Sequence, residues 1–429
     1  MRSQSWCQRA RTLLHTGTLL TGLCGALLVA PLVLAQSVAT DVAHFDVYAE
    51  GDTIHLLSGH GKKGGPSILL FHRVSKDGGT SWSKPVRVNA GSERLSAHHP
   101  GENPSIAGSG NRIVVAWTAP RPNARRGGLI QTAVSDDGGA TWRNGPSPFA
   151  DAAGSQTFMR MVAAANSGGT STPGTGSGAA ASATGGGAAR GMHMVWLDSR
   201  EGRQGLRYAK SDDLGASWGK DTGLAPRTCD CCWNSIATRA GAGGASEVSV
   251  LYRGGEPRDM MHMASSDGAK WNTPSSIGGF GWRIDGCPHV GGALAVRDKT
   301  LHSLVWTGKD GAQGLYHAAL GASVAGSDAA WGKPKKLGTD DAKNADLTVM
   351  PDGSLVAVWD ETTGRGSPLR MAKSADGITW STAETVPAKP EATHPRVVAT
   401  SKGAAVFWFE GSPWNSARLV VNGREISAP

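Results

Sequence analysis

Long apolar runs are missing from the sequence after residue 35. Since no later stretch is long and apolar enough to span a bilayer, we expect no membrane span and a soluble product. Phenylalanine is also scarce, with 7 residues against 15 tryptophans and 60 glycines, which indicates many tight turns and a recurring tryptophan. Charge of one sign is not concentrated anywhere, and this dispersal argues against a surface for nucleic acid or membranes.

The N-terminal segment has the features of a signal peptide. Three arginines precede the apolar run TLLTGLCGALLVAPLVLA, and its last residues, VLA, suit a signal peptidase. We therefore expect residues 1–35 to be removed by cleavage near Ala35, and the product, which starts near Gln36, to be periplasmic or secreted. A lipoprotein is not expected, because Leu23 precedes Cys24 where the lipoprotein signal needs a small residue. Loss of the three arginines lowers the net charge from +8 to +5, that is, 40 basic minus 35 acidic residues.

The 394 residues that remain (429 minus 35) exceed the usual size of one compact domain. The abundance of glycine and tryptophan favours one large repeat architecture over several domains. A motif of the form S-x-D-x-G-x-x-W supports this choice. Full copies begin at Ser75, Ser135 and Ser211, copies one residue shorter begin at Ser265 and Ser374, and a decayed copy begins at Ser327.

This motif resembles the Asp-box, or BNR repeat, of the sialidase-like propellers. Its serine and aspartate side chains can accept hydrogen bonds from backbone N–H groups two residues on, its glycine supplies a positive φ, and its tryptophan covers the turn. The box therefore closes a hairpin and is structural. For this reason the box aspartates are poor catalytic candidates: Asp77, Asp137, Asp213, Asp267 and Asp376.

Apolar strands that end in an aromatic residue recur with the same period, at Trp117, Trp196, Tyr252, Trp306, Trp359 and Trp408. Each unit of about 50 residues then holds four strands, with the box between the third and the fourth, which predicts an all-β propeller of four-stranded antiparallel blades. The interval between Trp117 and Trp196 is the longest. It contains residues 166–189, a low-complexity insertion that we expect to be a disordered loop.

The first strands of these units, from FDVYAEG to PRVVAT, favour seven blades. Six blades are the alternative, because the first and last units match the pattern least well. The last unit has no Asp-box, so residues just after Gln36 could supply its outer strand and close the ring. We expect such a propeller to be a monomer.

The cysteines of the mature chain fall at corresponding places in the repeat. Cys229, Cys231 and Cys232 lie in the connection that enters the innermost strand of the fourth blade, and Cys287 lies in that of the fifth. Because innermost strands line the central tunnel, we expect the four side chains to lie within reach of one another at the tunnel mouth, where a small ligand, a glycan or a metal ion would bind. The same connections of other blades hold His98, His99, Glu102, Asn103, Met159, Arg160, Met161, Asn344, Asp346, His394 and Arg396.

Residues 228–293 resemble a branch of bacterial secreted BNR/sialidase-like proteins. The shared elements are the C-x-C-C cluster, an arginine-aspartate strand in RDMMHMASSDGAKW, and a W-x-I-x-G-C-P element in GWRIDGCPHVGG. The branch usually has proline after the cysteine cluster, where this chain has Trp233. Since its members are commonly labelled sialidase-like without an assigned reaction, the resemblance implies the fold more firmly than an activity.

A metal site and a pair of disulfides both fit the four cysteines. As thiolates, Cys229, Cys231, Cys232 and Cys287 would suit Cu(I) or Zn(II), with His99, His289 and Met161 nearby, and copper is favoured in an oxidising compartment. In an exported protein the same cysteines can form two disulfides with three alternative connectivities, although a vicinal Cys231–Cys232 bridge is strained. A third alternative combines the two: one disulfide, with the other two thiols binding a metal or acting in redox chemistry.

The family resemblance also suggests an exo-α-sialidase or a related glycoside hydrolase. It implies an arginine triad, an acid/base aspartate and a tyrosine nucleophile assisted by a glutamate. The Phe/Tyr-Arg-Ile-Pro signature of that family is missing. The candidates at the tunnel are Arg160, Arg283 and Arg396 for a substrate carboxylate, and Glu102 or Asp346 as titrating groups. Tyr208, Tyr252 and Tyr316 fall at strand positions repeated between blades and Tyr48 lies in the first strand, so the sequence leaves open whether the chain is an enzyme.

Overall fold

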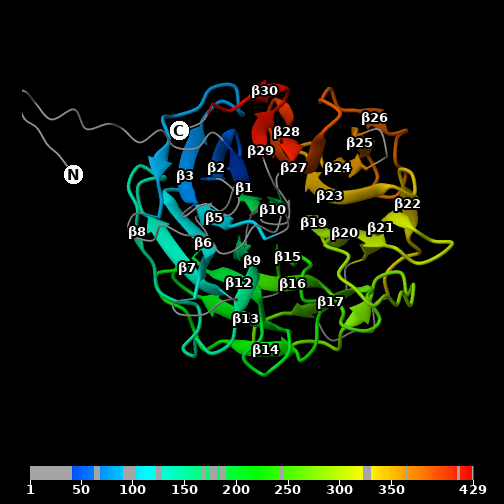
Figure 1. Cartoon of the computed structure of the whole chain (residues 1–429), viewed down its shortest axis with the longest axis horizontal. Helices are drawn as coiled ribbons and strands as arrows, with labels where there is room; N and C mark the ends of the chain where they lie inside the picture. The colour runs from blue at the N-terminus through cyan, green and yellow to red at the C-terminus, as the bar shows by residue number, and fades with distance from the viewer. Residues whose placement is uncertain are drawn as a thin grey trace, which may run out of the picture. The chain divides into compact units, whose positions relative to one another are not determined.

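The computed structural model describes residues 41–61, 68–89, 102–121, 128–165, 171–173, 181–183, 190–241, 246–321, 330–362, 366–412, 416–427 and 429. Their strands form seven four-stranded antiparallel sheets and one two-stranded sheet, and the seven larger sheets are the blades of a β-propeller (Figure 1). Within these ranges, no helix has the length and apolar character needed to cross a membrane. The predicted signal segment, residues 1–35, lies outside the described residues.

Each blade is one chain segment, and its strands run outward from the axis in chain order. Blade 1 contains β1 (Val42–Glu50), β2 (Thr53–His60), β3 (Leu69–Ser75) and β4 (Val86–Arg87). Blade 2 contains β5 (Ser105–Ser109), β6 (Arg112–Pro120), β7 (Gly128–Ser135) and β8 (Arg143–Asn144). Blade 3 contains β9 (Gln156–Ala163), β12 (Met192–Asp198), β13 (Gly205–Ser211) and β14 (Thr222–Ala225). Blade 4 contains β15 (Ser235–Ala240), β16 (Ser246–Arg253), β17 (Met260–Ser265) and β18 (Ser275–Ser276).

The remaining blades follow the same order. Blade 5 contains β19 (Ala293–Arg297), β20 (Thr300–Thr307), β21 (Gly314–Leu320) and β22 (Lys335–Leu337). Blade 6 contains β23 (Ala342–Val349), β24 (Leu355–Glu361), β25 (Leu369–Ser374) and β26 (Glu384–Thr385). Blade 7 contains β27 (Ala392–Thr400), β28 (Gly403–Ser412), β29 (Ser416–Val421) and β30 (Arg424–Glu425). The prediction of seven blades is therefore confirmed, and the alternative of six is wrong.

The ring closes by packing between its first and last blades. The innermost strands β1, β5, β9, β15, β19, β23 and β27 follow one another around the axis, and β27 lies next to β1. Phe45 of β1 packs edge-to-face on Phe409 of β28, with ring centroids 4.7 Å apart. The prediction that residues just after Gln36 supply the outer strand of blade 7 is wrong. β30, at the C-terminal end of that blade, is its outer strand.

The Asp-boxes close the turns between third and fourth strands, as predicted. In blade 2, the Ser135 Oγ accepts a hydrogen bond from the Gly139 N–H at 2.7 Å, and the Asp137 Oδ1 accepts one from the Thr141 N–H at 2.9 Å. Hydrogen bonds from the Thr141 hydroxyl, the Thr141 N–H and the Ser135 hydroxyl lower the pKa of exposed Asp137 to about 2. The box carboxylates are thus committed to backbone turns.

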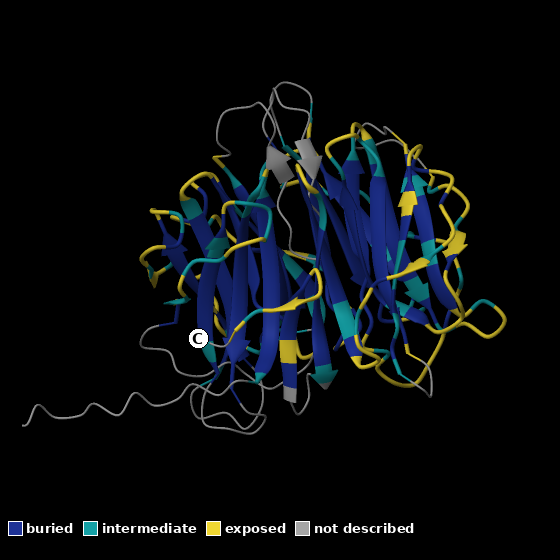
Figure 2. Ribbon diagram, turned by 90° about the horizontal axis from the view of Figure 1, so that it is seen from above, coloured by how far each residue is buried: buried dark blue, intermediate teal, exposed yellow. Residues whose placement is uncertain are grey.

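The box tryptophans fill the wedges between blades, whose strands are largely buried (Figure 2). In four blades, the residue three positions before the end of the third strand lies against the tryptophan of the following blade. The pairs and their ring-centroid distances are His72–Trp142 at 5.3 Å, Tyr208–Trp271 at 4.9 Å, His262–Trp331 at 5.2 Å and His317–Trp380 at 5.0 Å. The repeat motif therefore builds both the turn and the contact between blades.

The low-complexity insertion contains one short hairpin. β10 (Ser171–Pro173) pairs with β11 (Ala181–Ala183), and these strands lie next to β19 and β1 respectively. The expected disordered loop is therefore corrected for these six residues. The other residues of 166–189 lie outside the described residues.

Candidate functional site

The cysteine cluster lies in the connection that precedes β15, the innermost strand of blade 4. Thr228 forms an isolated antiparallel bridge with Gly254. The Cys229 N–H donates to the Arg253 carbonyl at 3.0 Å. These backbone contacts hold the connection against the end of β16, so the three cysteine side chains are buried: Cys229, Cys231 and Cys232.

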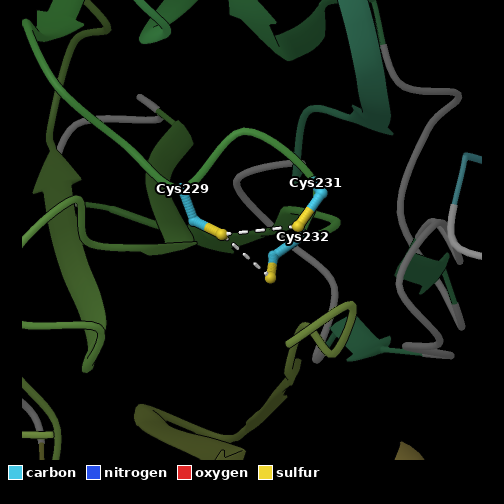
Figure 3. Close-up of side chains that lie close together, drawn as sticks. All are labelled: Cys229, Cys231 and Cys232. Carbon is cyan, nitrogen blue, oxygen red and sulfur yellow. Dashed lines mark hydrogen bonds between the residues drawn. The ribbon is translucent and has the colours of Figure 1, made fainter. Parts of the chain in front are cut away.

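Their three sulfur atoms converge (Figure 3). The Cys229 Sγ lies 3.3 Å from that of Cys232 and 3.7 Å from that of Cys231. All three sulfurs lie within 4.8 Å of one another, which makes a group that could hold a metal ion. The separations exceed the bond length of about 2.05 Å of a disulfide, so the three residues are free thiols.

Cys287 lies beside this cluster but is exposed, in the connection between β18 and β19. Its thiol interacts electrostatically with those of Cys231 and Cys229, but it lies outside the group of three sulfurs that come within 4.8 Å of one another. Blades 4 and 5 therefore bring Cys287 near the three buried cysteines, while Cys287 itself is open to solvent.

The three buried thiols shift one another's pKa values strongly. Hydrogen bonds from Cys231 and Cys232 lower the pKa of Cys229, and the charge of the half-buried Arg258 acts in the same direction. Burial raises the pKa of Cys232 to about 12. The pKa of Cys231 is raised by its hydrogen bond with Cys229. The buried group thus favours one thiolate that accepts from two neutral thiols.

The residue after the cluster, Trp233, contacts the opposite side of the ring. Trp233 is 3% exposed, and its ring centroid lies 6.2 Å from that of His394, which belongs to blade 7. Blades 4 and 7 are not neighbours in the ring, so this contact crosses the axis. Gly291, which precedes β19, also lies against the indole, and a Cβ atom there would be 2.3 Å from the Trp233 ring.

Four buried charged side chains lie on the innermost strands. Asp46, Arg160, Asp346 and Arg396 come from blades 1, 3, 6 and 7 and are at most 6% exposed. They interact electrostatically around the axis. Burial raises the pKa of Asp346 to about 7 and lowers that of Arg160 to about 10. The structure thus brings together the predicted candidates Arg160, Asp346 and Arg396, and adds Asp46.

These charges also bind neighbouring blades. The Asp46 Oδ2 accepts a hydrogen bond from the Ile106 N–H at 3.0 Å, and the Asp346 Oδ2 accepts one from the Val397 N–H at 2.9 Å. The Arg160 Nη1 donates to the carbonyls of Asn103 and Pro104 at 3.4 and 3.3 Å. Among the described residues, the Arg160 Nε and Nη2 atoms and the Asp346 Oδ1 atom have no hydrogen-bond partner.

Several other predicted site residues that the structure describes are not part of the group of converging sulfurs. Arg283, a candidate for the tunnel, is exposed and pairs with Glu256, while Met161 is buried in the hydrophobic core. Glu102 is half-buried, and burial raises its pKa to about 7. His289 is exposed, two residues after Cys287, with a φ of 54°. His98 and His99 lie outside the described residues.

The four tyrosines occupy packing positions. Tyr208 hydrogen bonds to His193 at 2.6 Å and Tyr316 donates to the Ala312 carbonyl at 2.8 Å. Tyr48 and Tyr252 are buried in the hydrophobic core. None of these contacts joins a tyrosine to the charges around the axis.

Sequence reasoning missed two features of the site. Asp46 lies within FDVYAEG, the first strand of the first unit, and its position matches that of Asp346 because both carboxylates accept a hydrogen bond from the next innermost strand. Alignment of the innermost strands could have found it. The contact of Trp233 with His394 has no signal in the sequence, because it depends on how the ring closes.

Comparisons with known proteins give only distant likenesses. No family model matches the chain, and none of the curated proteins matches it. The chain is similar to the Hadza microbial sialidase Hz136, at 12% identity and a TM-score of 0.43 over 84% of this chain and 74% of that one. It is similar to a protein of unknown function from Dyadobacter fermentans, at 15% identity and a TM-score of 0.43 over 78% and 93%. It is also similar to the six-bladed fucose-binding lectin of Aleuria aurantia, at 13% identity and a TM-score of 0.45 over 81% and 97%. At these identities and TM-scores the likenesses carry no argument about activity. The evidence for the propeller fold is the strand pairing of this chain itself.

Proposed function

We propose that this chain is an exported propeller that binds one soft metal ion, Cu(I) or Zn(II), through Cys229, Cys231 and Cys232, with Cys287 as the fourth ligand. The observation that carries the proposal is the convergence of three buried sulfur atoms, 3.3 and 3.7 Å apart in the two closest pairs. Thiolate sulfur is the ligand that both ions prefer.

The spacing of the sulfurs suits coordination. With metal–sulfur distances of about 2.3 Å, the sulfurs of a tetrahedral site lie about 3.8 Å apart and those of a trigonal site about 4.0 Å apart. To reach these values the Cys229–Cys231 separation must grow by about 0.1–0.3 Å and the Cys229–Cys232 separation by about 0.5–0.7 Å. A disulfide between Cys229 and Cys232 would instead need the sulfurs to approach by more than 1 Å.

The surrounding charges support an anionic cluster. Three thiolates around one monovalent or divalent cation leave a net negative charge, and the positive charges of Arg258 and Arg253 favour the thiolate forms of Cys229 and Cys232. Metal binding displaces the protons that the buried thiols otherwise share.

The proposal includes the membership and location expected from the sequence. We place the chain in the C-x-C-C branch of secreted BNR/sialidase-like proteins and in the periplasm or outside the cell, after cleavage near Ala35. In such an oxidising compartment, a bound ion would protect the three buried thiols against disulfide formation.

Glycan binding or glycoside hydrolysis is the second candidate. It draws on the unpartnered Nε and Nη2 atoms of buried Arg160 and the Oδ1 atom of Asp346, which could meet a polar ligand near the axis. Turnover of a fluorogenic sialoside that is lost in Arg396→Ala and kept in Cys287→Ser would support it. The contacts of Asp46 and Asp346 with the next blades account for part of these charges without a substrate.

The metal proposal is tested by anaerobic titration of fully reduced protein with Cu(I) and with Zn(II). We expect one ion per chain, and a loss of affinity of at least about 100-fold in Cys229→Ser, Cys231→Ser or Cys232→Ser. Asp230→Asn is the matched control, because this exposed residue lies within the cluster without a ligand sulfur. Because Cu(I) is stable with three thiolates, whereas zinc would lose one of its four protein ligands, Cys287→Ser should weaken Zn(II) binding more than Cu(I) binding. Four oxidised cysteines in the isolated protein, with no uptake of either ion after reduction, would overturn the proposal.

A further inference from the structure

The junction between blades 6 and 7 differs from five other junctions of the ring, at each of which an aromatic contact with a tryptophan joins the two blades. In blades 1, 3, 4 and 5, the residue three positions before the end of the third strand lies against a tryptophan of the following blade. At the junction that closes the ring, Trp82 of blade 1 lies against Phe407 of blade 7, with ring centroids 6.1 Å apart. An indole ring is therefore the usual filling of these wedges.

Blade 7 cannot supply this ring, because it has no Asp-box. Its strands β29 and β30 are joined by Asn422 and Gly423 alone. The position in blade 6 that would meet the missing tryptophan is Met371, three residues before the end of β25, and its side chain is half-buried. A groove of about 920 Å³ lies beside Met371 between the two blades.

The groove has an apolar floor and a charged rim. Val356, Val406 and Trp408 line the floor and are at most 5% exposed. Exposed Lys373 and Lys402 lie at the rim, together with the acidic residues Asp352 and Glu384. Pockets of about 300–1,000 Å³ with apolar walls and a few polar groups are typical of small-molecule sites.

The groove is separate from the cysteine cluster. It lies beside the turns Met350–Ser354 and Thr400–Gly403, which follow the C-terminal ends of β23 and β27. The cysteines precede the N-terminal end of β15. Because the innermost strands of a propeller run in the same direction, the two sites lie at opposite ends of the ring.

We propose that this groove binds a small ligand through a planar aromatic group, which takes the place that a box tryptophan fills at the other junctions. Methionine sulfur makes favourable contacts with the edges of aromatic rings. Met371 can therefore contact the aromatic group of the ligand, at the position where a histidine or a tyrosine contacts the tryptophan in blades 1, 3, 4 and 5. Buried Trp408 forms part of the apolar floor beneath such a ring. The charged rim can bind a polar substituent of the same ligand.

The test uses 2-naphthol as the probe and its saturated counterpart, decahydro-2-naphthol, as the matched ligand control. Binding to the mature full-length chain is measured by calorimetric titration and by saturation-transfer NMR. Ala404→Phe fills the groove from blade 7, since Ala404 lines it and is half-buried. Ile378→Phe adds the same ring at a site on blade 6 that is 73% exposed and outside the groove.

We expect saturable binding of one 2-naphthol per chain, at least tenfold tighter than that of the saturated counterpart. Ala404→Phe should weaken it at least tenfold, whereas Ile378→Phe and Cys231→Ser should leave it within twofold. If Ala404→Phe does not fold, Met371→Trp places an indole in the groove from the other wall and should have the same effect. Absence of saturable binding by folded wild-type protein, or equal binding by a folded groove-filling variant, overturns the proposal.

Discussion

The indole ring of Trp233 and the imidazole ring of His394 lie with their centroids 6.2 Å apart, although they belong to blades 4 and 7. The contact crosses the axis directly after the cysteine cluster. Because Trp233 is adjacent in the chain to Cys232 and packs on Gly291, its position is coupled to that of the sulfur atoms.

Gly291→Ala should therefore disturb both stability and the metal site. A Cβ atom there would lie 2.3 Å from the Trp233 ring and 2.4 Å from its carbonyl oxygen, so the tryptophan must move. We expect a loss of about 1–3 kcal/mol in the free energy of unfolding, as for other overpacked sites, and weaker metal binding. Urea unfolding followed by tryptophan fluorescence measures the first effect.

Gly286→Ala is the control for this substitution. It lies in the same connection, but its nearest neighbour would be 4.0 Å from an added Cβ atom. Equal unfolding curves and equal metal affinities for the two variants would contradict the coupling between Trp233 and the cluster.

A buried histidine should make the protein sensitive to acid. Burial lowers the pKa of His262 to about 3, against an ordinary value of about 6.5. Between these two pH values the unfolded chain binds a proton that the folded chain does not, so stability is lost as the pH falls below 6.5. His262→Phe keeps a ring against Trp331 and should remove this loss, which amounts to about 2 kcal/mol between pH 8 and pH 5.

Urea unfolding at pH 8 and pH 5 measures the effect of His262→Phe. The change in the free energy of unfolding between the two pH values is determined for each protein and then compared. This removes the contributions of Asp346, Asp360 and Glu102, whose raised pKa values affect the stability of both proteins in the opposite direction. Identical changes of the free energy of unfolding with pH in the two proteins would show that His262 is not the cause.

An Asp-box aspartate should affect stability without affecting the metal site. In Asp213→Ala, the Ser217 N–H and hydroxyl lose the carboxylate that accepts from them at 2.8 and 2.6 Å. We expect a lower midpoint of thermal unfolding and unchanged metal affinity. Asp212→Ala is the control, since this neighbour is exposed and outside the turn network, and its midpoint should stay near that of the wild type. Weaker metal binding in Asp213→Ala would count against a purely structural box.

The blades could be predicted from the sequence because their signals are local. Each Asp-box from Ser75 to Ser374 predicts a turn at its own position, and each strand that ends in an aromatic residue indicates one blade. The closure of the ring could not be predicted in the same way. β30 is only two residues long and has no box before it, so nothing in the sequence identifies Arg424–Glu425 as an outer strand.

The sequence was sufficient to predict which connections between blades hold the site. The repeat places Cys229 and Cys287 in the connections into two neighbouring innermost strands, and the structure brings them to one place. The order of burial, with Cys232 at 1% exposure and Cys287 exposed, depends on the backbone contacts of Thr228 and Cys229 with blade 4, which no sequence pattern encodes.

X-ray absorption spectroscopy of the protein loaded with one Cu(I) or Zn(II) ion tests the central claim most directly. The account predicts a first coordination shell of three or four sulfur atoms at about 2.3 Å, with one sulfur fewer in Cys231→Ser. A shell of nitrogen and oxygen ligands, or the same sulfur count in Cys231→Ser as in the wild type, would contradict a metal site built from Cys229, Cys231 and Cys232.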